Sequence, residues 1–296
     1  MPGGRAREPQ EWGAADARGV LRVPTASDHK YSRGVVSLRT GSESYPGAAV
    51  LSVEGATRAG VGMVRWDGPS SVAALVLQRR PETVIGTGRT TAWVIGSGMD
   101  ARARTDAEAA ILHDILSGTE PAVVDAGALD LAASAACPVI VTPHDGELRE
   151  VRIPLGFGID DVDEAPLNER LASGFAERAL VARETAVALG AVVLLKGAST
   201  IVATPGGWWT VVRSGTPWLA TAGSGDVLAG VIGAVLAGAQ AESVEDLGPV
   251  AATGAWLHGA AARLAAGASS ASIGHPITAI DVAGHLPAAF ALAQAN

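Results

Sequence analysis

A glycine-rich segment that runs directly into an apolar helix constrains this chain most. Residues 221–226 read Thr-Ala-Gly-Ser-Gly-Asp, and residues 227–236 are all apolar or glycine. Small residues before a helix-length apolar run predict a loop that opens a buried helix. The first turn of such a helix has N–H groups without acceptors and a partial positive charge, so it attracts phosphate. The glycines allow the backbone to approach a ligand closely.

Asp226 stands in this first turn. A carboxylate beside an anion site is repelled by the anion, so we interpret Asp226 as a base that acts on a hydroxyl group near the phosphate. The alternative is that Asp226 caps the helix, because aspartate is a frequent capping residue. Short glycine-rich matches are weak evidence by themselves, and the segment alone leaves both interpretations open.

Composition indicates a compact α/β domain. Of the 296 residues, 48% are hydrophobic and 18% are charged, which is enough apolar material for a large core. The net charge of −8 argues against nucleic acid and anionic membranes as partners. The single cysteine excludes an internal disulfide. Neither a secretory signal nor a convincing membrane span is visible, so we expect a cytoplasmic protein with a disordered tail at residues 1–14 and one domain at residues 15–296.

Short β-branched runs alternate with helical stretches along most of the chain. Strands are predicted at 92–96, 122–124, 138–141 and 192–195, and helices at 106–116, 170–189 and 250–266. This alternation predicts right-handed crossovers and a mostly parallel sheet with helices on both faces. Residues 200–204 and 208–213 flank a Pro-Gly-Gly turn and predict an antiparallel hairpin that extends the sheet.

Polar and glycine residues that follow these strands should meet at one edge of the sheet. In an open parallel sheet, ligands bind outside the carboxyl ends of the strands. The residues at or just beyond this edge are Gly98, Asp125, His144, Lys196, Gly225 and Asp226. The sequence therefore predicts one crevice in which these separate signals converge.

Six short motifs, taken together and in order, resemble a known family. They are Tyr-Pro-Gly-Ala-Ala at 45–49, Val-Ile-Gly-Ser-Gly at 94–98, Thr-Pro-His-Asp-Gly-Glu at 142–147, Leu-Lys-Gly-Ala-Ser-Thr at 195–200, Ala-Gly-Ser-Gly-Asp-Val-Leu-Ala-Gly at 222–230 and Leu-His-Gly-Ala-Ala at 257–261. The chain resembles the ADP-dependent NAD(P)H-hydrate dehydratases, which are carbohydrate-kinase-like members of the ribokinase-like superfamily. The resemblance extends from about Lys30 to Pro287 and implies a ribokinase-like α/β fold.

The resemblance implies an ADP-dependent lyase that repairs damaged nicotinamide nucleotides. In this family the substrate is (6S)-hydrated NADH or NADPH, in which water has added across a ring double bond. Hydroxide is a poor leaving group, so the ring hydroxyl is phosphorylated from ADP and phosphate is then lost, which regenerates NAD(P)H and releases AMP and phosphate. By resemblance, Asp226 activates this hydroxyl, and backbone N–H groups of Gly223, Ser224 and Gly225 hold the charge on the transferring phosphoryl group.

Further site residues follow from the same resemblance. Those expected to bind the nucleotide are Lys196, Gly197, Ala198, Ser199, Thr200 and Gly225. Those expected to contact the hydrated substrate are Gly47, Ala48, Gly98, His144 and Asp226. Glu147 occupies the place of a carboxylate that organises Mg²⁺ through water, so ADP and Mg²⁺ are the expected ligands besides the substrate.

Most of these residues also have a structural interpretation. Lys196 ends a buried strand and needs an anionic partner, which is either a phosphate or a protein carboxylate. His144 could cap a helix instead of binding the substrate, and Glu147 could be favoured by a helix dipole. The small residues at 47, 48 and 98 either admit the ligand or allow tight packing. We expect His258, on an apolar helix, to be a satisfied core histidine.

The chain departs from the family pattern at several positions. Tyr31 follows Lys30 where relatives usually carry glycine, and Gly127 replaces a carboxylate. Residues 213–217 read Arg-Ser-Gly-Thr-Pro in place of Asn-x-Thr-Gly-Asn-Pro, and Ala222 and Ser224 stand where glycine and threonine are common. These departures bear on the metal shell and on the choice of phosphoryl donor.

Two other hypotheses keep the same fold. One is an ATP-dependent kinase of a small alcohol such as a vitamin precursor, and the other is a catalytically impaired nucleotide-binding homologue. Bifunctional family members carry an additional epimerase domain, for which there is no room before Lys30, so we expect that activity from a separate protein. Relatives are commonly homo-oligomers, and we expect the same here.

Overall fold

A nine-stranded sheet forms the middle layer of the computed structural model, which describes residues 10–157, 166–239 and 241–295. The strands are β1 (Val35–Arg39), β2 (Met63–Trp66), β3 (Val84–Ile85), β4 (Ala92–Ile95), β5 (Ala122–Val124), β6 (Val139–Val141), β7 (Val192–Leu195), β8 (Thr200–Ala203) and β9 (Trp209–Val212). Their order is β3-β2-β1-β4-β5-β6-β7-β8-β9. Neighbours from β3 to β7 pair in parallel, whereas β8 is antiparallel to both β7 and β9.

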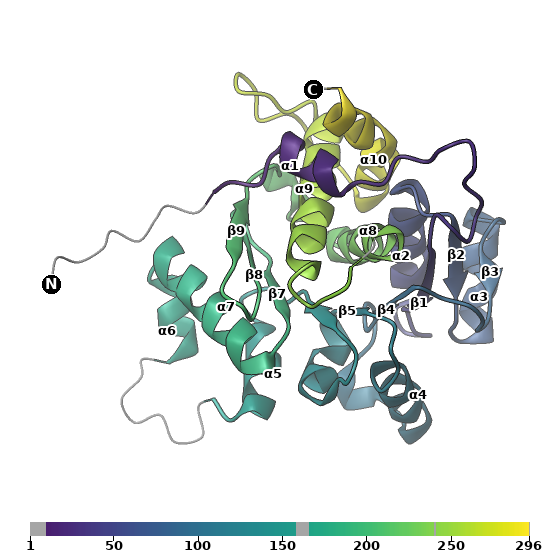
Figure 1. The fold of residues 1–296 in the computed structure, drawn as a ribbon, viewed down its shortest axis with the longest axis horizontal. Coiled ribbons are helices and arrows are strands. Elements are labelled where there is room, and N and C mark those ends of the chain that lie inside the picture. Colours follow the sequence, from purple (N-terminus) through teal and green to yellow (C-terminus); the bar gives the residue numbers. More distant parts are fainter. Residues whose placement is uncertain (1–9, 158–165, 240, 296) are drawn as a thin grey trace, which may run out of the picture.

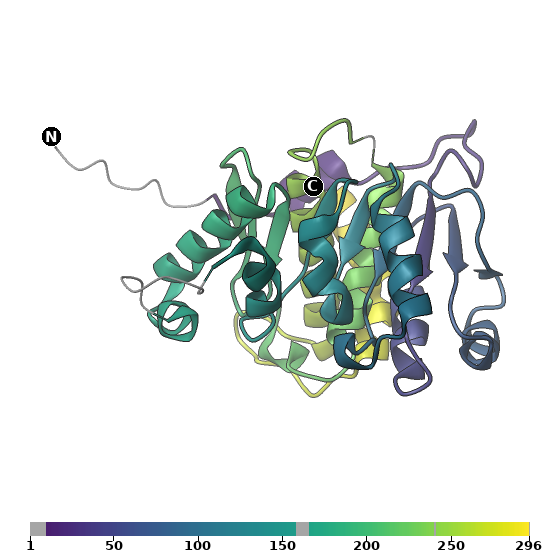
Figure 2. The same cartoon turned by 90° about the horizontal axis from the view of Figure 1, so that it is seen from below.

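Helices cover both faces of this sheet (Figures 1 and 2). One face carries α1 (Ala14–Val20), α2 (Pro46–Arg58), α8 (Ser224–Gly238), α9 (Leu247–Ala266) and α10 (Ala279–Gln294), with α3 (Ser70–Arg79) packed against α2. The other face carries α4 (Asp106–Leu116), α5 (Leu148–Arg152), α6 (Leu167–Ala172) and α7 (Phe175–Leu189). Short 3-10 segments lie at Ala101–Ala103, Ala126–Ser134, Ile153–Leu155 and Pro217–Leu219.

Each face of the sheet has its own apolar core, because successive side chains of a strand point to opposite faces. In β7, Val192 and Leu194 belong to the core beneath α8 and α9, while Val193 and Leu195 belong to the core on the α7 side. Strands that are covered on both faces are buried at every position, as β1, β5, β6 and β7 are.

The predicted mostly parallel α/β sheet with an antiparallel extension is confirmed. The strands predicted at 92–96, 122–124, 138–141 and 192–195 correspond to β4, β5, β6 and β7, and the predicted hairpin is β8–β9. The single helix predicted at 170–189 is wrong. Gly174, with a φ of 120°, separates α6 from α7 there, and this is a backbone conformation that a helix cannot contain.

Residues 10–12 lie against β9 and α1 begins at Ala14, although the sequence suggested a disordered tail at residues 1–14. The N–H of Trp12 donates to the carbonyl of Val211 in β9 at 2.9 Å. Its ring meets the ring of Trp208 edge to face, with 5.7 Å between the centroids. Aromatic pairs of this geometry contribute beyond the area that they bury. Residues 1–9 of the predicted tail lie outside the described residues.

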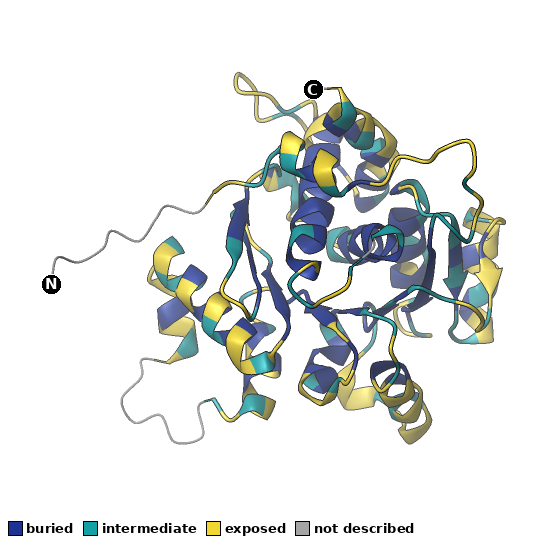
Figure 3. Ribbon diagram, in the orientation of Figure 1, coloured by how far each residue is buried: buried dark blue, intermediate teal, exposed yellow. Residues whose placement is uncertain are grey.

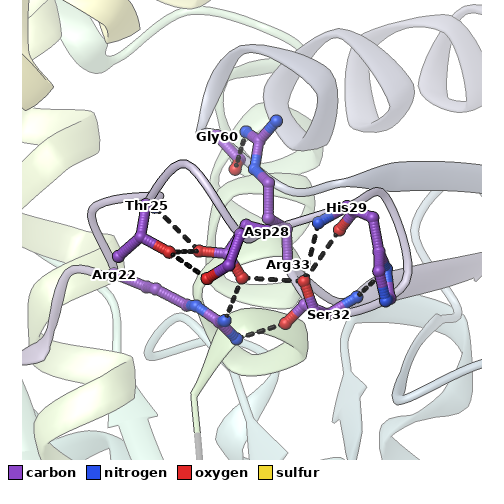
Figure 4. A network of polar contacts seen from close by, with 8 residues as sticks. Arg22, Thr25, Asp28, His29, Ser32, Arg33 and Gly60 are labelled. Carbon is purple, nitrogen blue, oxygen red and sulfur yellow. Dashed lines mark hydrogen bonds and ion pairs between the residues drawn. The ribbon is translucent and has the colours of Figure 1, made fainter.

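Asp28 organises the segment that leads into β1. Its carboxylate accepts hydrogen bonds from the N–H of Thr25 at 2.8 Å, from the hydroxyl of Ser32 at 2.7 Å and from Arg22 at 2.6 Å (Figure 4). These hydrogen bonds hold the pKa of Asp28 well below its ordinary value. The network orders a surface segment that has no regular secondary structure of its own.

Helix α8 runs through the middle of the molecule and is buried at every position from Val227 to Ala237 (Figures 1 and 3). It crosses α2 at close range because glycines replace side chains at the crossing. A methyl group on Gly230 would overlap the carbonyl of Ser52, and one on Gly55 would overlap the carbonyl of Val227. Apolar as α8 is, no helix within the described ranges has the length and hydropathy needed to cross a membrane.

The crossing makes a specific prediction for Gly230→Ala. The added methyl group has to push α2 away from α8, so we expect a loss of about 1–3 kcal/mol in the free energy of unfolding. The matched control is Gly284→Ala in α10, where nothing lies within 4 Å of the new methyl group. That control should gain roughly 0.5–1 kcal/mol from helix propensity. Urea denaturation of both variants tests this, and equal stabilities would contradict the crossing.

Candidate active site

The carboxyl ends of the parallel strands meet at one edge of the sheet, as predicted. Asp125 directly follows β5, Lys196 directly follows β7, and the segment 142–147, called the substrate loop below, follows β6. The N-terminus of α8 reaches the same edge, because a methyl group on Gly225 would lie 3.8 Å from the Nζ of Lys196. The predicted convergence of separate motifs on one edge is therefore observed.

Lys196 forms the centre of a charged network. Its Nζ lies 3.0 Å from the Oδ1 of Asp125 and 3.3 Å from the Oε2 of Glu147. Burial by itself lowers the pKa of Lys196, but the negative charges of Asp125 and Glu147 more than offset it, so the pKa lies above its ordinary value. The protein carboxylates that we considered as alternative partners are present, and Lys196 is a cation near neutral pH.

Asp125 is buried and fully engaged. Besides Lys196, it accepts hydrogen bonds from the Ser97 hydroxyl at 2.8 Å and from the Thr142 hydroxyl at 2.7 Å. These donors hold the Asp125 side chain in one position at this edge. Sequence reasoning placed Asp125 at the edge without a role, and its position directly after a buried strand was the available signal.

Asp226 differs from every other carboxylate at this edge. Burial raises its pKa from the ordinary value of 3.8 to about 6, the negative charge of Asp125 adds to this effect, and Lys196 opposes it. Within the described part of the chain, no donor forms a hydrogen bond to the Asp226 carboxylate, so it does not cap α8. A carboxylate with a pKa near 6 and free lone pairs is suited to proton abstraction.

The first turn of α8 offers backbone donors beside Asp226. Gly223 precedes the helix with a φ of 85°, a conformation that favours glycine. By helix geometry, the N–H groups of Ser224, Gly225 and Asp226 have no acceptor inside the helix. The N–H of Ser224 makes a long contact of 3.4 Å with the carbonyl of Thr221, and the Ser224 hydroxyl donates to the carbonyl of Leu219 at 2.9 Å. Gly225 and Asp226 therefore supply the free donors.

His144 and Glu147 cap the start of α5 reciprocally. The N–H of His144 donates to the Oε2 of Glu147 at 2.9 Å, and the N–H of Glu147 donates to the Nδ1 of His144 at 3.1 Å. The capping interpretation of His144 is thus observed, and Glu147 is the second member of the same reciprocal pair. The His144 side chain is still 58% exposed, with its Nε2 3.5 Å from Glu147, so it remains accessible to a ligand.

Tight packing accounts for two of the small residues predicted to contact the substrate. Gly98 has a φ of 69°, and a methyl group there would overlap the side chain of Ala48 and lie 3.2 Å from the carbonyl of Tyr45. Gly47, in the first turn of α2, is exposed, and nothing lies within 4 Å of its missing side chain. The α2 N-terminus and the 96–98 turn therefore form one compact corner of the edge.

Residues 196–200, called the nucleotide loop below, follow β7 at the surface. The Thr200 hydroxyl donates to the carbonyl of Gly197 at 3.1 Å and closes the loop. Arg213, one of the departures from the family pattern, donates from its Nε to the Ser199 hydroxyl at 3.1 Å and stacks on Phe175 at 5.1 Å. Sequence reasoning did not connect Arg213 with this loop, because the two are joined only by the β8–β9 hairpin.

Gly127 and His258 are two further positions singled out in the sequence. A side chain on Gly127 would overlap the carbonyl of Met99, so no carboxylate fits where relatives carry one. His258 is buried in α9 as predicted, and burial lowers its pKa to about 4. The expectation that it is satisfied holds only in part: a hydrogen bond with the backbone of Ser224 opposes the lowering of its pKa, but its Nε2 has no hydrogen-bond partner within the described ranges.

The residues at the edge fit a magnesium ion that arrives with phosphate ligands. Within residues 10–157, 166–239 and 241–295, no group of three or more histidine, cysteine or acidic side chains is arranged to hold a metal. Glu147 is half-buried, with 23% of its side chain exposed, and it forms an ion pair with Lys196. Mg²⁺ commonly binds through one or two carboxylates, waters and substrate phosphates, so this donor set is compatible with it.

The sequence profile of the NAD(P)H-hydrate dehydratase family, a carbohydrate-kinase-type profile, matches residues 36–281. The chain belongs to this family. The resemblance seen in the six motifs is thereby confirmed, and with it the ribokinase-like fold.

Curated and solved members of this family extend the comparison. The chain is 34% identical to the ADP-dependent (S)-NAD(P)H-hydrate dehydratase of Neisseria meningitidis, over 82% of this chain and 81% of that enzyme. It is 39% identical to the bifunctional NAD(P)H-hydrate repair enzyme of Mycobacterium tuberculosis, over 76% of this chain but only 45% of that enzyme. The chain thus spans about half the length of such bifunctional relatives.

A solved family structure has the same fold throughout. The ADP/ATP-dependent NAD(P)H-hydrate dehydratase of Bacillus subtilis, co-crystallised with ATP and Mg²⁺, superposes with a TM-score of 0.81 at 29% identity. The superposition covers 97% of this chain and 100% of that one. The sheet edge described above therefore belongs to a scaffold that this family shares.

The raised pKa of Asp226 predicts that Asp226→Asn stabilises the protein at neutral pH. The folded-state pKa of about 6 exceeds the ordinary 3.8, so the ionised carboxylate opposes folding above pH 6 and is neutral in both states below pH 3.8. We expect the variant to gain about 2–3 kcal/mol at pH 7.5, and this gain should vanish at low pH. Urea denaturation at pH 7.5 and pH 4 measures it.

Asp246→Asn is the matched control with the opposite sign. Hydrogen bonds from Ser243 and the N–H of Glu242 lower the pKa of Asp246, so its ionised form favours folding and the variant should be less stable at pH 7.5. An Asp226→Asn protein that is no more stable than the wild type at pH 7.5 would contradict the raised pKa of this half-buried carboxyl group.

Proposed function

We propose that the chain catalyses the ADP-dependent dehydration of (6S)-hydrated NADH and NADPH, with release of AMP and phosphate. The observation that carries this proposal is the position of Asp226: a carboxylate with a pKa near 6, in the first turn of α8, beside the Lys196–Asp125 pair. Family membership supplies the substrate class, and the related Neisseria enzyme is named as ADP-dependent.

Asp226 is proposed to accept the proton of the ring hydroxyl as its oxygen attacks the β-phosphorus of ADP. The oxygen–phosphorus bond forms, the bond to the AMP oxygen breaks, and AMP leaves. Loss of phosphate and of a ring proton then restores the double bond. Asp226 suits the first step, because about nine-tenths of a group with this pKa is ionised one unit above it.

The negative charge of the transferring phosphoryl group needs preorganised donors. We assign this role to the free N–H groups of Gly225 and Asp226, together with the partial positive charge of the α8 N-terminus. We assign Lys196 and the nucleotide loop to the part of ADP that leaves as AMP. Gly47, Ala48, Gly98 and His144 are assigned to the hydrated dinucleotide.

Mg²⁺, when bound, would neutralise charge on the nucleotide phosphates. Glu147 is the residue proposed to hold it, through water, since its carboxylate is partly exposed at the edge. The proposal also includes a homo-oligomeric state, a cytoplasmic location and an epimerase activity supplied by another protein.

Recovery of the reduced nicotinamide absorbance from hydrated NADH tests the proposed function. We expect recovery with ADP, accompanied by equimolar AMP and phosphate, and little recovery without nucleotide. Recovery only with ATP would show that ATP, and not ADP, is the phosphoryl donor. No recovery from a protein that binds ADP would contradict the proposal, and transfer from ATP to small alcohols would then be measured.

Asp226→Asn should separate binding from turnover. Removal of the proposed base should lower kcat by about 10²–10⁴-fold, the usual contribution of a general base. The Kd for ADP should stay within about threefold, since no phosphate ligand is lost. Steady-state kinetics and ADP titration measure the two effects. Parallel losses of kcat and ADP affinity would assign Asp226 to binding instead.

A further inference from the structure

An arginine outside the six motifs joins the two loops that meet at the site. Arg178 lies near the start of α7. Its guanidinium donates to the carbonyl of Lys196 at 3.1 Å and to the carbonyl of Ser199 at 3.3 Å, so it holds both ends of the nucleotide loop. The same guanidinium pairs with Asp145 of the substrate loop, with Nη2 2.8 Å from Oδ1 and Nε 3.2 Å from both carboxylate oxygens. We call Arg178 and Asp145 the clasp.

The clasp is packed as well as hydrogen-bonded. The Arg178 side chain is only 14% exposed, and a methyl group on Gly197 would lie 2.7 Å from its Nη2. The guanidinium therefore covers one side of the nucleotide loop. A backbone hydrogen bond of 2.8 Å from the N–H of Lys196 to the carbonyl of Pro143 joins the same two loops beside it. The Arg178 and Asp145 side chains thus add to a backbone contact between the two loops just beyond the ends of β6 and β7.

Peptide geometry gives this contact a consequence for a ligand. The C=O and N–H of one trans peptide point in opposite directions. Because Arg178 holds the carbonyl of Lys196, the N–H of Gly197 points away from the guanidinium, toward the uncovered side of the loop. A backbone N–H held in this way is a ready donor for a phosphate or ribose oxygen. Without the clasp, this peptide could rotate.

We propose that Arg178 and Asp145 are positioning residues that hold the nucleotide loop and the substrate loop in one arrangement. Arg178 acts through the carbonyls of Lys196 and Ser199, and Asp145 acts through Arg178. Neither residue is a catalytic residue. The inference rests on the proposed function, because it assigns the two loops to ADP and to the hydrated dinucleotide.

Electrostatics and positioning predict opposite effects for Asp145→Ala. ADP is an anion, so removal of a nearby negative charge should by Coulomb's law alone tighten its binding. If Asp145 instead anchors Arg178, its removal should loosen the nucleotide loop and weaken ADP binding. Asp145 is 47% exposed, so the variant should fold like the wild type.

The test is isothermal titration of ADP, and separately of NADH, into the full chain at 0.15 M salt. We expect the Kd for ADP to rise about fivefold in Asp145→Ala and about tenfold in Arg178→Gln. The double variant should be no weaker than Arg178→Gln, since both changes break one clasp. Arg178→Lys should recover only part of the loss, because an ammonium cannot reproduce the planar fork. The Kd for NADH should rise in the same variants.

Two controls carry the same charge changes at neighbouring positions. Arg183→Gln removes an exposed arginine of α7 that stacks on Trp209, and Glu150→Ala removes an exposed carboxylate of α5. Both should bind ADP and NADH like the wild type. Their agreement with the wild type would exclude a general effect of charge near the site.

Tighter or unchanged ADP binding in Asp145→Ala would overturn the proposal. So would additive losses in the double variant, or a lower melting temperature with unchanged Kd values, which would mark a purely structural pair. If Arg178→Gln does not fold, the Kd for ADP of Asp145→Ala alone tests the proposal. The titrations require no turnover, so they test the clasp independently of the proposed function. A wild type that binds ADP and NADH but does not dehydrate the substrate would contradict the proposed function. The Kd values of the variants would still test the clasp.

Discussion

The close crossing of α8 over α2 is the constraint on which the site depends. Gly55 and Gly230 allow the two helix backbones to touch, and Gly223 turns the chain into α8 with a left-handed conformation. Together they bring the half-buried first turn of α8, a helix buried from Val227 to Ala237, to the carboxyl edge of the sheet. Asp226 is part of that turn, so its burial, its raised pKa and its neighbours all follow from where the helix starts.

The charges at this edge are balanced rather than simply positive. Lys196 sits between Asp125 and Glu147, and Asp125 is in turn held by two hydroxyl groups. This arrangement keeps Lys196 cationic for an anionic ligand while Asp125 raises the pKa of Asp226. A globally acidic chain can in this way offer a local anion site. It can also hold a base, Asp226, beside that anion site.

Local patterns predicted the parts of the fold that local physics determines. β-Branched runs predicted β4 to β7, and the glycine-rich start of α8 predicted a buried helix beside an anion site. Contacts between residues far apart in the chain could not be predicted from the sequence. Arg178 lies outside the six motifs, and the motif at 142–147 gave no sign that Asp145 pairs with it. In the same way, the buried Glu54 pairs with Arg79 and Arg80 at the end of α3. Such pairs are set by packing, which periodicity does not encode.

The most direct test of the account is a titration of the Asp226 carboxyl group itself. Carbon-13 NMR of protein labelled at aspartate, with Asp226→Asn to assign the signal, follows this one group without interference from nucleotide phosphates. The account predicts a midpoint near pH 6, and a lower midpoint when Asp125→Asn removes the neighbouring charge. A midpoint at or below pH 4 in the wild type would contradict the assignment of Asp226 as a half-buried base.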